Sequence, residues 1–265
     1  MTKDTENNFS NRPPFEDLLG TTSLPAEAQN VCRYDLETGE VCSGDLSPLP
    51  SRAMRRIARR SKSSSRGGVV VQLPSWARPR IVYFESKLEQ RVLFLLLARG
   101  DLTDLWEQPP SIIYWDERGS RRTHYFDFLI QLSSGRRVAI AVKPAKRAMQ
   151  LDFVKELGCI RSAMHKDFAD DLILITDQDF TKAEALNAER YHEFSRSRNE
   201  PAFARLKDTI RTIAFPTSVA ALSRSLGAGD QSFRTVFIAI YEGLLSVDRT
   251  MPIDTDTTVY LGAVQ

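Results

Sequence analysis

The most regular pattern of apolar and polar positions lies between residues 85 and 101, which read ESKLEQRVLFLLLARGD. Apolar residues recur there at the spacing of one helical face, and Gly100 marks a stop. Glu85 and Glu89 are four residues apart, so a helix would place both carboxylates on one face beside the apolar stripe. The pattern predicts an amphipathic helix that carries two glutamates. Its apolar face consists of Leu88, Val92, Leu95 and Leu96.

The next patterns along the chain are those of strands. SIIYW (111–115) precedes the turn signal DERG (116–119), and two further apolar runs follow. These runs, RTHYFDFLIQL (122–132) and RRVAIAV (136–142), are joined by a short Ser-Ser-Gly turn. The segment therefore predicts three strands, of which the last two form a hairpin.

Side chains alternate across a strand, and this decides which residues of the predicted hairpin can meet. Asp127 is expected on one face of the first strand, and Phe126 and Phe128 on the other. Pairing of the two strands can bring Asp127 beside Lys143, and the preceding helix can bring Glu89 to the same point. The corresponding face of the second strand carries Ala139, Ala141 and Lys143.

The remaining elements place these strands in a mixed α/β domain. Residues 146–166 and 180–198 have helical periodicity, and VVVQL after Gly67-Gly68 predicts a short strand. LILIT (172–176) is nearly all apolar, as expected of a strand covered on both faces. The order of helix, three strands, helix, strand and helix predicts a central mixed sheet flanked by helices.

The last part of the chain has a different pattern. Residues 201–214 are amphipathic, two further helices are predicted around the turn at Gly227-Ala-Gly229, and SVDRTMPIDTDTTVYLG (246–262) has the composition of a β-hairpin. Helix, turn, helix and wing form the pattern of a winged helix-turn-helix. No dense basic recognition helix accompanies it, so the alternative is a small structural cap that meets a protein partner.

The N-terminal region combines a polar segment with a basic one. Residues 1–50 show no sustained periodicity and are predicted to be mostly disordered or loosely draped over the fold. Residues 51–66 contain six arginines, one lysine and no acid, which suits either a solvated linker or an arm that neutralises nucleic-acid phosphates. The candidate DNA contacts are Arg55, Arg56, Arg59, Arg60, Lys62, Arg66 and, beyond the strands, Lys146.

We therefore divide the chain into an N-terminal region with its basic arm (1–66), a central domain (67–199) and a winged-helix-like C-terminal domain (200–265). The 265 residues are 42% apolar and 26% charged with a net charge of +2, as in ordinary globular proteins. No apolar run approaches the roughly 20 residues that span a bilayer, and the N-terminus lacks a secretion signal. The three cysteines have no paired spacing, which fits a cytoplasmic location.

Glu89, Asp127 and Lys143 form the candidate catalytic set. Mg²⁺ and Mn²⁺ prefer oxygen ligands, often one or two carboxylates completed by water and substrate phosphate. Such a cation neutralises the charge that develops in phosphodiester hydrolysis and lowers the pKa of a bound water, while Lys143 would hold that water or stabilise the charge. The alternative is structural, with Asp127 and Lys143 as an ion pair and Glu89 as a surface charge. No His/Cys cluster suggests zinc, and His124 is expected to be structural or to face phosphate rather than to be a ligand.

Several motifs in fixed order, FESKLEQ, EQPPSIIYWDERG, YFDFLI and GRRVAIAVKP, resemble the TnsA-type endonuclease subunit of heteromeric bacterial transposases over residues 80–180. The resemblance implies a restriction-endonuclease-like fold, a metal-dependent PD-(D/E)xK site and a C-terminal winged-helix domain. It assigns the helix glutamate to Glu89, the metal aspartate to Asp127 and the lysine to Lys143. Glu85 and Gln108 match supporting positions.

The chain departs from that family pattern at two positions. Phe126 stands where proline usually precedes the aspartate, and Ala141 stands where glutamate or glutamine usually lies two residues before the lysine. An alanine side chain cannot ligate a metal, so the Val142 backbone carbonyl with water, or Glu85, would fill that place.

The resemblance implies a Mg²⁺- or Mn²⁺-dependent endonuclease that nicks double-stranded DNA at transposon ends. It would work with a DDE-type transposase subunit and an ATP-dependent transposition regulator, without a membrane. Two alternatives stay open: a catalytically degenerate subunit that binds DNA or assembles the complex, which Ala141 favours, and a stand-alone phage or repair nuclease.

Overall fold

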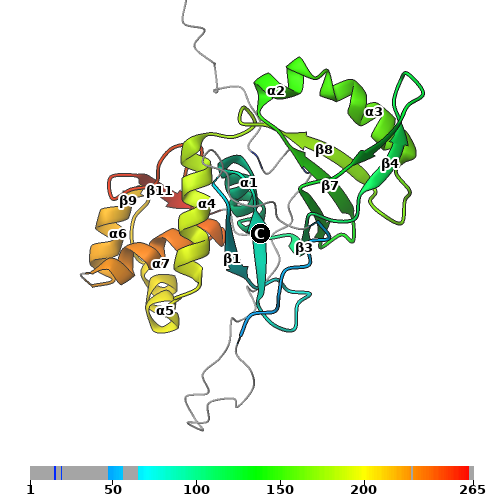
Figure 1. Ribbon diagram of the computed structural model, residues 1–265. Helices are drawn as coiled ribbons and strands as arrows, with labels where there is room; N and C mark the ends of the chain where they lie inside the picture. Colours follow the sequence, from blue (N-terminus) through cyan, green and yellow to red (C-terminus); the bar gives the residue numbers. More distant parts are fainter. Residues whose placement is uncertain (1–14, 16–18, 20–46, 56–64, 228, 263–265) are drawn as a thin grey trace, which may run out of the picture.

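The computed structural model describes residues 15, 19, 47–55, 65–227 and 229–262. Its centre is a four-stranded sheet with the order β3-β6-β7-β8 (Figure 1). β3 and β6 are antiparallel, β6 and β7 are antiparallel, and β7 and β8 are parallel. The strands are β3 (Leu102–Glu107), β6 (Phe128–Leu132), β7 (Arg137–Val142) and β8 (Asp171–Ile175).

Helices cover both faces of this sheet. Helix α1 (Lys87–Leu97) packs on the face that carries Phe128, Ile130 and Ile140. Helix α3 (Phe153–Ala163), which follows the short α2 (Ala145–Gln150) in the β7–β8 crossover, packs on the opposite face. That face of β7 carries two alanines, Ala139 and Ala141, whose small side chains let the helix approach closely. The mixed α/β class predicted from the sequence is therefore confirmed.

The predicted strand at 122–132 is two strands with different partners. Its first part, β5 (Arg121–His124), pairs with β4 (Ile112–Trp115) in a hairpin outside the central sheet, and β6 begins only at Phe128. Because the chain turns between these strands, Phe126 packs on the α3 side and Phe128 on the α1 side. The prediction that these two phenylalanines share a face is wrong.

Three other strands complete this part of the molecule. β3, which was not predicted, forms one edge of the central sheet. β1 (Gly67–Val71) was predicted and pairs with β2 (Arg80–Phe84), which was not. The described residues of the N-terminal region are also packed rather than loose, since Leu49 forms a parallel bridge with Arg80.

Two more residues correct the predicted disorder of the first 50 residues. Phe15 and Leu19 are only 3% and 2% exposed and belong to the core cluster on the α1 side of the sheet. The rest of residues 1–46 lies outside the described part of the chain.

The C-terminal part alternates short strands and helices. Its three-stranded sheet has the order β10-β11-β9. Helix α7 lies in the middle, and its last seven residues are all buried. The elements are α5 (Glu200–Thr209), β9 (Thr217–Ser218), α6 (Val219–Ser225), α7 (Asp230–Tyr241), β10 (Leu245–Ser246) and β11 (Thr258–Leu261).

Helix α4 (Lys182–Ser195) joins the two parts, because it packs against α1 on one side and α7 on the other. Figure 1 shows α4, α6 and α7 gathered on the opposite side of the molecule from α2 and α3. The fully buried amide of Asn187 in α4 donates to the carbonyls of Arg249 and Met251 and accepts from the N–H of Ile253. The loop between β10 and β11 is therefore held on α4.

Within the described ranges, no helix combines the length and the apolar character that a bilayer crossing requires.

Candidate active site

Glu89 is fixed in the first turn of α1 by the residues that begin the helix. The Ser86 hydroxyl accepts a hydrogen bond from the Glu89 N–H at 3.1 Å and donates to Glu89 Oε1 at 2.8 Å. The backbone N–H of Glu85 donates to Glu89 Oε2 at 2.7 Å. Because Ser86 is the N-cap, Glu85 lies before the helix and not on its face, which corrects the expected placement.

Asp127 lies at the start of β6, where it contacts both neighbouring strands. Its Oδ2 accepts a hydrogen bond from the Val142 N–H at 2.6 Å, and its backbone carbonyl accepts one from the Gln108 N–H at 2.8 Å. The N–H and C=O of one strand residue point to the same side, so the Val142 carbonyl also faces the β6 side. The next residue is turned the other way, since the Lys143 N–H donates to the Ile175 carbonyl on β8.

The electrostatics of Asp127 are unfavourable for a carboxylate. Burial, and after it the nearby Glu89 carboxylate, raise its pKa to about 7 against the lowering effects of the Val142 N–H, Lys143 and Arg55. Burial also raises the pKa of Glu89, although hydrogen bonds from Glu85 and Ser86 oppose this. Two acidic groups from separate elements are thus held in one partly desolvated region.

Lys143 projects from the same face of β7 as Ala141, as predicted. Its ammonium group lies 4.3 Å from the centroid of the Phe153 ring, at the start of α3. Ala141 is only 2% exposed and belongs to the apolar cluster beneath α3. In the described part of the chain, no ion pair joins Lys143 to Asp127, so the structural ion pair of the alternative interpretation does not form. The charge of Lys143 still lowers the pKa of Asp127.

His124 lies between aromatic rings next to this site. Its ring centroid is 4.6 Å from that of Phe126 and 5.6 Å from that of Phe153. Burial lowers its pKa to about 4; nearby Glu156 opposes the shift, and Lys143 adds to it. A neutral, ring-packed imidazole agrees with the expected structural role.

Arg55 brings the two predicted supporting residues together at the edge of the site. Its Nη2 lies 2.5 Å from Glu85 Oε2, and its Nε donates to Gln108 Oε1 at 2.6 Å. The guanidinium lies over the Tyr125 ring at 5.8 Å. Gln108 is buried and adopts a left-handed backbone with φ 47°, which is uncommon for a residue other than glycine. Arg55 was predicted as a DNA contact, and the structure places it beside the carboxylates.

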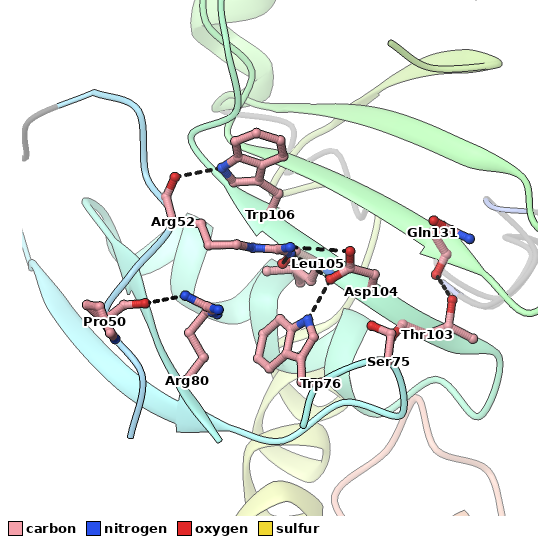
Figure 2. A network of polar contacts seen from close by, with 10 residues as sticks. All are labelled: Pro50, Arg52, Ser75, Trp76, Arg80, Thr103, Asp104, Leu105, Trp106 and Gln131. Carbon is pink, nitrogen blue, oxygen red and sulfur yellow. Dashed lines mark hydrogen bonds and ion pairs between the residues drawn. The ribbon is translucent and has the colours of Figure 1, made fainter. Parts of the chain in front are cut away.

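A second arginine, which sequence reasoning did not single out, anchors the segment that carries Arg55. Figure 2 shows the Arg52 side chain near the two tryptophans Trp76 and Trp106, each with its ring centroid 5.5 Å from the guanidinium. Arg52 forms an ion pair of 2.6 Å with Asp104, which also accepts from the Trp76 indole N–H. The Trp106 indole N–H donates to the Arg52 carbonyl. The two tryptophans therefore anchor the residue 47–55 segment.

The other candidate DNA contacts are separate from this arrangement. Arg56, Arg59, Arg60 and Lys62 lie outside the described residues. Arg66 is half-buried just before β1, and Lys146 is exposed in the first turn of α2. Their contact with phosphate stays a prediction.

The donors available for a metal are Glu89, Asp127 and the Val142 carbonyl. Among the residues that the structure describes, no group of three or more His, Cys, Asp and Glu side chains is arranged to hold a metal ion. Two carboxylates, a carbonyl and water suit Mg²⁺ or Mn²⁺, which keep several water ligands, and do not suit structural zinc. The donor set therefore fits the predicted cation with Ala141 making no contribution.

The chain matches no protein-family model. A search of curated proteins likewise found no match.

Proposed function

We propose that this chain is a Mg²⁺- or Mn²⁺-dependent DNA endonuclease that nicks DNA at transposon ends as one subunit of a heteromeric transposase. The observation that carries the proposal is the placement of Glu89 and Asp127. Glu89 lies in the first turn of α1 and Asp127 directly before β6. Burial raises the pKa of both carboxyl groups, the Glu89 carboxylate raises that of Asp127 further, and the charge of Lys143 opposes this rise. Such a like-charged, desolvated pair is unfavourable by itself and becomes favourable when a cation lies between its members.

The order of elements supports the same proposal. The central sheet contains the antiparallel strands β3, β6 and β7 and the parallel strand β8. Helix α1 precedes these strands in the chain, and helix α3 lies between β7 and β8, so one helix covers each face. This order agrees with the restriction-endonuclease-like fold that the resemblance implies. Asp127 and Lys143 lie at the ends of adjacent strands, where such a fold would place its site.

The proposed chemistry divides between the cation and the chain. When bound, the cation neutralises charge on the phosphate and lowers the pKa of a water molecule. Asp127, Glu89 and the Val142 carbonyl would hold it. Lys143 would orient the attacking water or stabilise the charge on the phosphorus oxygens, and its ammonium already faces the Phe153 ring on one side. In-line attack would leave a 5′-phosphate and a 3′-hydroxyl.

Ala141 supports the alternative function, a catalytically degenerate subunit that assembles the complex. The side chain at this position packs beneath α3, so the residue that usually supplies a third ligand is here part of the core. A site with two carboxylates binds metal more weakly than one with three. We favour retained activity because Glu89, Asp127 and Lys143 are all present, and the charges of Glu89 and Lys143 both act on Asp127.

The C-terminal part would serve the transposase partner rather than read DNA through α7. A recognition helix needs a free face to enter the major groove, but α7 is buried along its last seven residues, and only Asp230 and Gln231 at its start are exposed. This burial favours the structural cap over the DNA reader. The exposed apolar side chains of Tyr260 and Leu261 on β11 are available to a protein partner.

A nicking assay tests the proposal. Supercoiled plasmid bearing the transposon ends would be incubated with the full chain and the transposase encoded beside it, with Mg²⁺ or Mn²⁺. We expect nicking that Asp127→Asn and Lys143→Ala each reduce by about 100-fold or more, while Glu117→Gln, on the exposed β4–β5 turn, leaves it unchanged.

Equal nicking by the wild type and Lys143→Ala would refute the enzymatic proposal. Complex formation with the transposase but no cation-dependent nicking would identify the degenerate assembly subunit. Nicking that is equally strong without the transposase would identify a stand-alone nuclease.

A further inference from the structure

The positive charge of Arg55 acts on all three carboxyl groups of the candidate site, those of Glu85, Glu89 and Asp127. The guanidinium contacts Glu85 and Gln108 directly, at 2.5 and 2.6 Å. It also lowers the pKa of both Glu89 and Asp127. The four side chains that the sequence assigns to metal binding or its support are therefore all under the influence of one arginine from the N-terminal region.

The backbone before Arg55 is fixed, so this placement is built into the fold. The Met54 N–H donates to the Gln108 carbonyl at 3.0 Å. The Ser51 hydroxyl donates to Glu107 Oε1 at 2.5 Å, and this carboxylate is fully buried at the end of β3. Together with the ion pair between Arg52 and Asp104, these contacts hold residues 51–54 along β3, immediately before the site.

We propose that Arg55 is an internal counter-ion of the candidate metal site and competes with the divalent cation for its carboxylates. The inference rests on the proposed function, because it concerns the same site. Arg55 pairs with Glu85, whose backbone N–H donates to Glu89, and with Gln108, whose backbone N–H donates to the Asp127 carbonyl. Its guanidinium therefore satisfies part of the negative charge that attracts a dication, and it repels a dication bound beside these residues. Loading of the metal must therefore work against Arg55.

Two features make Arg55 suited to this role and to removal by mutation. Its side chain is 41% exposed, so it is not part of a core whose loss would unfold the chain. Arg52 has the structural role in this segment, since it contacts two tryptophans and Asp104. The competition thus depends on a residue that is separable from the anchor.

The test measures Mn²⁺ binding to the full chain by isothermal titration calorimetry, without DNA. Arg55→Ala and Arg55→Gln both remove the charge, and the glutamine keeps a polar side chain able to hydrogen bond with Glu85 or Gln108. The matched control is Arg118→Ala, which removes an equal charge from the exposed β4–β5 turn. Asp127→Asn identifies the part of the binding that belongs to the candidate site.

We expect both Arg55 variants to bind Mn²⁺ about fivefold to tenfold more tightly than the wild type, and Arg118→Ala to stay within about twofold of it. Affinities of the Arg55 variants equal to or below that of Arg118→Ala overturn the inference, while Asp127-dependent binding in the wild type leaves the proposed function intact. If no protein shows binding that Asp127→Asn removes, the metal site itself is refuted, and both proposals fail. If Arg55→Ala does not fold, Arg55→Gln decides.

Discussion

Asp127 Oδ2 accepts a hydrogen bond of 2.6 Å from the backbone N–H of Val142, across the ends of β6 and β7. This bond orients the carboxylate without neutralising it. Because the Val142 carbonyl faces the same side as its N–H, a carboxylate oxygen and a carbonyl oxygen both lie on the side where the ends of β6 and β7 adjoin. The arrangement provides two hard oxygen donors from positions that β-sheet geometry alone keeps rigid.

The first prediction concerns the stability cost of Asp127. Its pKa is about 7 in the folded chain against 3.8 ordinarily, so the folded state binds the proton more tightly than the unfolded state. The contribution of Asp127 to the free energy of unfolding is therefore fully present below pH 3.8 and is lost as pH rises to about 7. In metal-free protein at pH 8, Asp127→Asn should raise the free energy of unfolding by roughly 1–3 kcal/mol, measured by urea denaturation.

The pH dependence provides the control for that prediction. Near pH 4 the wild-type carboxyl group is protonated in the folded state, so the gain from Asp127→Asn should shrink to near zero. A variant that is less stable than the wild type by the same amount at both pH values would show that the carboxylate is not under electrostatic strain.

The second prediction concerns His124, whose pKa of about 4 lies below its ordinary 6.5. Here the unfolded state binds the proton more tightly. The contribution of His124 to stability is therefore complete above pH 6.5 and is lost as pH falls toward 4. His124→Gln should lower stability at pH 7 through lost ring packing on Phe126 and Phe153.

The quantity to measure is the difference in free energy of unfolding between the wild type and His124→Gln as a function of pH. The deficit of His124→Gln relative to the wild type should narrow by roughly 1–3 kcal/mol between pH 6.5 and 4, because only the wild type loses stability by protonating this group. Charged groups near the imidazole, Glu156 and Lys143, are shared by both proteins. A deficit that stays constant across that range would contradict the lowered pKa.

The central sheet was only partly predictable, and β3 shows why. Its buried residues are Leu102, Leu105 and Glu107, a spacing that does not alternate because the register shifts between Leu102 and Asp104. Burial of a glutamate at the strand end further conceals the pattern. The strand is defined by pairing with β6, which lies more than 20 residues later in the chain and contributes nothing to the local pattern of β3.

The candidate site was predictable where its geometry follows from alternation and capping. The shared face of Ala141 and Lys143 required only the period of a strand. The true start of α1 was also readable, because Ser86 and Glu89 form an S-x-x-E signature that places Glu85 outside the helix. The position of Arg55 was not readable, since its partners come from segments that meet only in the tertiary fold. A run of basic residues shows that a segment is positively charged, but it does not show which acidic residues the segment will contact.

The third prediction concerns the anchor of the N-terminal segment. Arg52→Ala removes the ion pair with Asp104 and the contacts with Trp76 and Trp106. We expect a loss of about 1–2 kcal/mol in unfolding free energy and faster hydrogen exchange at the amides of Leu49 and Met54, which are bonded to neighbouring segments.

Arg52→Lys is the matched control, because it keeps the charge but loses the planar group that stacks on indole rings. It should fall between the wild type and Arg52→Ala in both measurements. Unchanged exchange at Leu49 and Met54 in Arg52→Ala would show that the backbone hydrogen bonds hold the segment without the arginine.

The last prediction concerns Asn187, which joins α4 to the loop between β10 and β11. Its side chain is fully buried, donates to two backbone carbonyls at 3.1 and 2.8 Å, and accepts from the N–H of Ile253 at 3.2 Å. Asn187→Ala would leave three backbone groups without these partners, at a cost of about 2–4 kcal/mol. Asn199→Ala is a matched control, because this asparagine only caps α5 and its loss should cost about 1 kcal/mol. Equal destabilisation by the two variants, or a loop between β10 and β11 that keeps its exchange protection in Asn187→Ala, would mean that apolar packing of α4 on α7 alone holds the C-terminal part in place.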